Sequence, residues 1–104
     1  MIGHLNRVTQ IVDKYNNLTI NSGSELSDLL RRLTCELFYL EKYRSEYQEQ
    51  HNSIMHNEKG AVSKALILAN EQVPELYMLR RVMNAAYRVV DALRSNISYI
   101  KKEQ

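Results

Sequence analysis

Turn-forming residues are scarce in this sequence, which has one Pro and three Gly among 104 residues. A β-rich or α/β chain needs such a residue about every ten positions, so the scarcity favours long helices. The single Cys excludes an internal disulfide framework. The mean hydropathy is −0.45, and no long apolar run offers a membrane span. At 12.2 kDa, residues 1–104 have the size of one helical domain, which we expect to be cytoplasmic because no signal segment opens the chain.

Two helices are predicted in the first half of the chain. Apolar residues spaced by three and four predict a short amphipathic helix over residues 2–16. A second helix is predicted over residues 24–57, and Ser22 with Glu25 fits a capping box at its start. Its apolar seam weakens where Arg44 and His51 occupy seam positions. The seam consists of Leu26, Leu30, Leu33, Leu37, Leu40, Tyr47 and Ile54.

The second half predicts helices over residues 61–71 and 74–101. Pro74 separates them, because a proline inside a helix clashes with the preceding turn, and a kink or a short break is expected there. The last helix has the most regular pattern in the chain, in alternating steps of three and four, which is typical of coiled-coil-like packing. Its apolar residues are Leu76, Leu79, Met83, Ala86, Val90, Leu93, Ile97 and Ile100.

These helices predict an all-α fold, an elongated antiparallel helical hairpin or bundle with coiled-coil-like packing and a short N-terminal helix. The last helix alone is about 40 Å long, more than a compact domain of this size accommodates. Apolar surface left uncovered by the first helix favours a homo-oligomer, most simply a dimer. In the alternative, the first helix and residues 61–71 complete a monomeric four-helix bundle.

Basic side chains concentrate at the C-terminal end. Residues 1–58 hold six Lys or Arg and eight Asp or Glu, whereas residues 59–104 hold eight and four. Six cations and one tyrosine of the last helix lie on one side of that helix, where Asp91 is the only acidic residue. We predict that they form a binding surface for an acidic protein or, alternatively, for nucleic acid. These residues are Arg80, Arg81, Tyr87, Arg88, Arg94, Lys101 and Lys102.

Tyrosines recur every four residues along the second predicted helix, at Tyr39, Tyr43 and Tyr47. Such a ladder either edges a core or anchors an interface, since tyrosine combines apolar area with a hydroxyl. We assign it, with five apolar residues of the last helix, to a candidate protein interface. Those five residues are Met83, Val90, Leu93, Ile97 and Ile100.

Catalytic and metal-binding signals are weak. His51 and His56 fall about 140° apart on a helix and lack further ligands at suitable spacing. Glu46 and Glu49 have the E-x-x-E spacing that can share Mg²⁺, but a second acidic pair is missing. Cys35 has no neighbouring base that would activate it. We therefore expect neither enzymatic activity, nor a metal, nor a cofactor.

The C-terminal pattern from Glu75-Leu76 through Leu79-Arg80-Arg81 to Leu93-Arg94-Ser95-Asn96 and Lys101-Lys102 resembles the tails of small all-helical proteins encoded by bacteriophages. The resemblance covers roughly residues 60–102 and implies an accessory factor in the host cytoplasm, in replication, recombination or anti-defence. Together with the apolar seams, it predicts an interaction protein that occupies a partner surface. The alternative is a sequence-nonspecific nucleic-acid-binding accessory protein.

Overall fold

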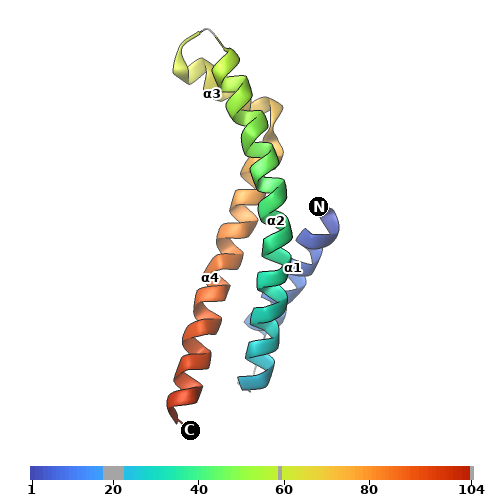
Figure 1. Cartoon of the computed structure of the whole chain (residues 1–104), viewed down its shortest axis with the longest axis vertical. Coiled ribbons are helices and arrows are strands. Elements are labelled where there is room, and N and C mark those ends of the chain that lie inside the picture. The colour runs from blue at the N-terminus through green and yellow to red at the C-terminus, as the bar shows by residue number, and fades with distance from the viewer. Residues whose placement is uncertain (18–22, 59, 104) are drawn as a thin grey trace.

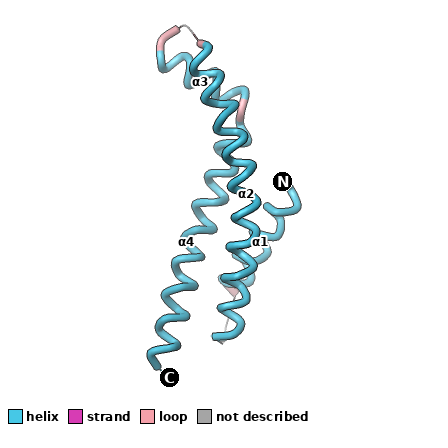
Figure 2. Tube along the Cα trace, in the orientation of Figure 1, coloured by secondary structure: helices cyan, strands magenta, loops and turns pink. Residues whose placement is uncertain are grey.

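The computed structural model describes residues 1–17, 23–58 and 60–103, and over these residues the chain is helical without a strand. Each observed boundary lies within two residues of the expected one, and the predicted all-α fold is confirmed (Figures 1 and 2). The helices are α1 (Ile2–Asn16), α2 (Gly23–Asn57), α3 (Val62–Gln72) and α4 (Pro74–Glu103).

The molecule is a slender rod built around α2 and α4. Figure 1 shows these two helices side by side, α1 beside the first half of α2, and α3 at the opposite end of the rod. The principal extents are 61 × 25 × 19 Å. The radius of gyration is 17.7 Å, whereas a compact domain of this length has about 13 Å. The chain is therefore elongated, as the helix lengths predict.

Hydrogen bonds between α2 and α4 fix their relative direction. The Arg80 guanidinium donates to the Gln48 side-chain oxygen, and the Tyr87 hydroxyl donates to Glu41 Oε1 at 2.8 Å. Residue numbers rise along α4 as they fall along α2, so the two helices run in opposite directions (Figure 1). They are not joined by a simple turn, because α3 lies between them in the chain.

The core lies between α1, α2 and α4. The stripe of α4 is buried from Leu76 to Leu93, and Ile97 and Ile100 pack half-buried against its end. Met83, Val90 and Leu93, which we assigned to a protein interface, have at most 3% of their surface exposed. That assignment needs correction, because these three side chains fill the chain's own core.

The seam of α2 differs from its prediction at two places. Leu29 is 1% exposed although it lies outside the expected heptad pattern, whereas Leu30 is only half-buried. α1 explains the difference, because it contacts α2 at Glu36, which lies two turns after Leu29 on the same face of the helix, and so widens the buried stripe beyond the contact with α4. His51, expected to weaken the seam, is 7% exposed and contributes a polar side chain to the buried stripe.

The chain breaks between α3 and α4 as Pro74 requires. Helix α3 ends at Gln72, Val73 has φ −127° and ψ 63°, and α4 begins at Pro74 itself. Proline fits this first position because it has no N–H to leave unsatisfied and its φ suits a helix. Ser22, the first residue of the expected capping box, lies outside the described residues.

Candidate interaction surfaces

The candidate binding residues of α4 all lie on the surface. Arg80, Arg81, Arg88, Arg94, Lys101, Lys102 and Tyr87 are exposed. The side chains of Arg80 and Tyr87 donate hydrogen bonds to side chains of α2. Arg81 and Arg88, in contrast, line none of the described pockets. The predicted set therefore divides into residues beside α2 and residues on the outer side of α4.

Arg94 connects two shallow pockets along α4. The first has a volume of about 270 Å³ and lies between α2 and α4. The second, of about 440 Å³, lies further along α4. The lining residues of the first are Thr34, Leu37, Phe38, Glu41, Tyr87, Val90, Asp91 and Arg94. Those of the second are Arg94, Ser95, Ser98, Tyr99 and Lys102.

A hydrogen bond from Tyr87 to the carboxylate of Glu41 lies at one edge of the first pocket. Partial burial raises the pKa of the Tyr87 hydroxyl, and its hydrogen bond to the Glu41 carboxylate raises that pKa further. Partial burial also raises the pKa of Glu41, but hydrogen bonds from Arg44 and Tyr87 outweigh this effect and leave it below its ordinary value. Glu41 therefore stays ionised and holds the Tyr87 side chain against α2.

The tyrosine ladder is covered in part by α1. The ring of His4 stacks on Tyr39 with centroids 4.8 Å apart, and it lies 6.3 Å from the ring of Tyr43. Tyr43 and Tyr47 pack half-buried against the core, while Tyr39 keeps 48% of its surface exposed. The ladder mainly anchors helices within the chain, which leaves Tyr39 as its most accessible member.

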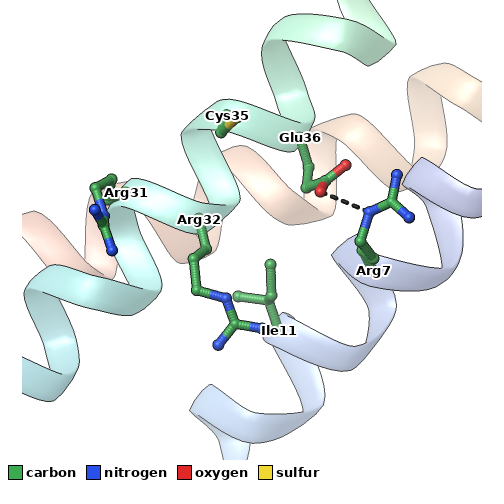
Figure 3. Close-up of a pocket in the computed structure, with 6 residues that line it drawn as sticks. All are labelled: Arg7, Ile11, Arg31, Arg32, Cys35 and Glu36. Atoms are coloured by element: carbon green, nitrogen blue, oxygen red, sulfur yellow. Dashed lines mark hydrogen bonds and ion pairs between the residues drawn. The ribbon is translucent and has the colours of Figure 1, made fainter.

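Glu36 of α2 holds α1 through two partners. Arg7 Nε donates to Glu36 Oε1 at 2.7 Å (Figure 3), and Nδ1 of His4 lies 2.6 Å from Glu36 Oε2. Arg7 and Glu36 border a pocket of about 280 Å³ that is also lined by exposed Cys35 (Figure 3). Burial raises the pKa of Glu36, but the bonds from His4 and Arg7 outweigh this effect and leave the pKa below its ordinary value.

The lowered carboxyl pKa values of Glu36 and Glu41 predict acid sensitivity. A carboxyl group whose pKa is lower in the folded chain stabilises the fold above its unfolded pKa. That stabilisation is lost as the pH falls through the folded pKa. We expect the melting temperature to drop steadily from pH 5 towards pH 3, with a smaller drop in the variant Glu36→Gln/Glu41→Gln, as measured by circular dichroism. Equal slopes for the two proteins would contradict the assignment.

His51 joins α2 to α3 inside the rod. Its Nε2 lies 2.9 Å from Asn70 Oδ1, and the bond fits a tautomer with the proton on Nε2, since an amide oxygen only accepts. Its Nδ1 is buried and has no partner among the described residues. His56 is exposed near the end of α2, so the two histidines do not converge on one site. No three His, Cys, Asp or Glu side chains within the described ranges are arranged to hold a metal ion.

Phe38 is the surface residue that the sequence pattern did not reveal. It is 75% exposed and borders the pocket shared by α2 and α4. The sequence shows only that Phe38 is an aromatic residue beside Tyr39 and outside the apolar seam of α2. Whether it is exposed depends on which side of α2 the other helices cover. Ring contact with Tyr39, at 5.7 Å between centroids, links it to the edge of the tyrosine ladder.

This chain was compared with protein families, curated proteins and solved structures. No protein-family model, no curated protein and no solved structure matches this chain. In the described residues, no helix is both long and apolar enough to cross a membrane. The surfaces of the molecule therefore carry the functional argument.

Proposed function

We propose that this chain is a non-enzymatic interaction protein that binds an acidic segment of another protein through the outer side of α4. One observation carries the proposal. Within the described residues, every arginine of α1 and α2 has an acidic partner, whereas none of the four arginines of α4 forms an ion pair. Of these four, Arg81 and Arg88 lie on the outer side of α4, whereas Arg80 donates to Gln48 of α2 and Arg94 borders the pocket between α2 and α4.

Unpaired arginines on one helix favour an anionic partner. From Arg80 to Lys102 the cations extend over roughly 33 Å at 1.5 Å per residue, the length of an acidic helix or extended segment. Guanidinium groups bind carboxylates through two parallel hydrogen bonds, so each arginine offers directional as well as electrostatic attraction. This arrangement supports surface occupancy as the mechanism, with no reaction at the bound partner.

Single-stranded nucleic acid is the second candidate partner. Tyr77 and Tyr99 are 72% and 66% exposed on the same helix as the arginines. Cations that neutralise phosphates and exposed rings that stack on bases are the usual components of such a surface. Carboxylates and phosphates both suit these arginines, so a comparison of a polyglutamate peptide with single-stranded DNA decides between the two partners.

The remaining functional assignments belong to the same proposal. We place the protein in the cytoplasm, as an accessory factor of the phage-encoded helical kind that its C-terminal segment resembles. We also propose that two copies associate, since α2 and α4 leave aromatic and aliphatic side chains exposed.

Charge reversal on α4 tests the binding surface. For the variant Arg81→Glu/Arg88→Glu we expect at least about a hundredfold weaker binding of a labelled polyglutamate peptide, because two attractions become repulsions. Fluorescence anisotropy at low salt measures it. The matched control Arg31→Glu/Arg32→Glu makes the same change in net charge on α2 and should bind within a few-fold of the unmodified chain. Equal loss in both variants would show a response to net charge rather than to α4.

A further inference from the structure

The rod exposes more surface than its mass requires. Its accessible surface is 7317 Å². A folded monomer of 12.2 kDa exposes about 6,100 Å² on average, so the excess is about 1,200 Å². Each partner in a standard protein interface contributes roughly 800 Å². The excess is larger than the area that one partner contributes to such an interface.

Within the described residues, neither α1 nor α3 covers one face of the α2–α4 pair along its middle. α1 contacts α2 through Glu36, and residues 36 and 38 point about 160° apart around a helix. Phe38 therefore faces away from α1, and it is 75% exposed. We call this surface the open face and define it by Thr34, Phe38 and Glu41 of α2 with Tyr87, Asp91 and Arg94 of α4.

The open face has the composition of an interface centre. Aromatic residues and arginine are enriched at such centres, and here Phe38, Tyr87 and Arg94 border a pocket whose floor is Leu37 and Val90. The surface is a pocket of about 270 Å³ rather than a flat patch, which gives a partner side chain a place to insert.

The open face carries charges of both signs, so two copies of it can be complementary to each other. Asp91 and Arg94 both border the pocket, and neither forms an ion pair in the part of the chain that the structure describes. A two-fold axis brings each patch against a copy of itself, so opposite charges within one patch can pair reciprocally. A polyanion, in contrast, would be repelled there by Glu41 and Asp91.

From these observations we infer that the open face is the contact between two copies of this chain. Phe38 of each copy packs into the pocket of the other, and Asp91 of one copy lies opposite Arg94 of the other. The inference rests on the proposed association of two copies and assigns a surface to it. Arg81 and Arg88 line no part of the open face, so the outer side of α4 stays available to the acidic partner.

Sedimentation equilibrium of the full chain tests the inference. The unmodified protein is expected at twice 12.2 kDa at concentrations of about 10–100 µM. Phe38→Glu is expected to be monomeric, with a dissociation constant raised at least about a hundredfold, because each copy would bury a carboxylate at the centre of the contact. The matched control Ile67→Glu alters a side chain 60% exposed on α3 and should remain dimeric.

Circular dichroism checks that both variants keep their helix content, and Phe38→Ala provides a milder substitution if Phe38→Glu does not fold. A monomeric unmodified chain throughout this range overturns the inference. Dimers that persist in Phe38→Glu overturn it as well. The result is separable from peptide binding: Arg81→Glu/Arg88→Glu should lose the peptide yet stay dimeric, whereas Phe38→Glu should dissociate yet still bind the peptide.

Discussion

Replacing Leu93 by Asp is expected to destabilise the fold by about 4 kcal/mol or more, because it buries a carboxylate without a partner. Leu93 is 0% exposed in the core between α1, α2 and α4. Folded domains of this size have about 5–15 kcal/mol of total stability, so at least about a quarter of it would be lost. The melting temperature should fall by about 15 °C or more in thermal unfolding followed by circular dichroism.

Ser95→Asp is the matched control for this substitution. Ser95 is exposed two residues further along α4, and the same carboxylate there remains in water. We expect its melting temperature to change by no more than about 3 °C, as for most surface substitutions. A Leu93→Asp chain that melts within the same range would show that α4 does not pack on α2 through this stripe.

Replacing Ala69 by Phe is expected to detach α3 from α2, at a local cost of about 3 kcal/mol. Ala65 and Ala69 are 4% and 0% exposed, and such small side chains let the two helices approach closely. A phenyl ring has no space there and must push α3 outward, which also separates His51 from Asn70. Amide hydrogen exchange should show faster exchange across residues 62–72, with α4 beyond residue 80 little changed.

Ile67→Phe controls for the added aromatic ring in α3. Ile67 is 60% exposed on the same helix, so a larger ring there remains largely in solvent. Exchange across residues 62–72 should then match that of the unmodified chain within a factor of about two. If Ala69→Phe left these amides equally protected, α3 would not be anchored to α2 through its alanines.

Long helices and their breaks could be predicted from the sequence because their determinants are local. A strict repeat of three and four apolar steps identified the buried stripe of α4, and Leu76, Leu79 and Leu93 are all at most 2% exposed. Pro74 marked the start of α4, since its restrictions act on the residues immediately before it. The exposed basic residues of α4 followed from the same periodicity.

Features that depend on a third helix could not be predicted in this way. Leu29 is buried and Phe38 is exposed because α1 lies on one side of α2, and no local pattern specifies that side. His51 is buried because α3 folds back and places Asn70 beside it. The same reason corrects the interface assignment of Met83 and Val90, whose stripe is covered by the chain's own helices.

Binding of an acidic polypeptide by the unmodified chain tests the central claim most directly. We expect saturable binding of a labelled polyglutamate peptide at about 20 mM salt, with affinity falling as salt rises, since exposed charges are screened beyond about 10 Å at 0.1 M. Single-stranded DNA of equal charge, measured alongside, should bind more weakly, and tighter binding of the DNA would favour the second candidate partner. Absence of saturable peptide binding at that salt concentration would contradict the account.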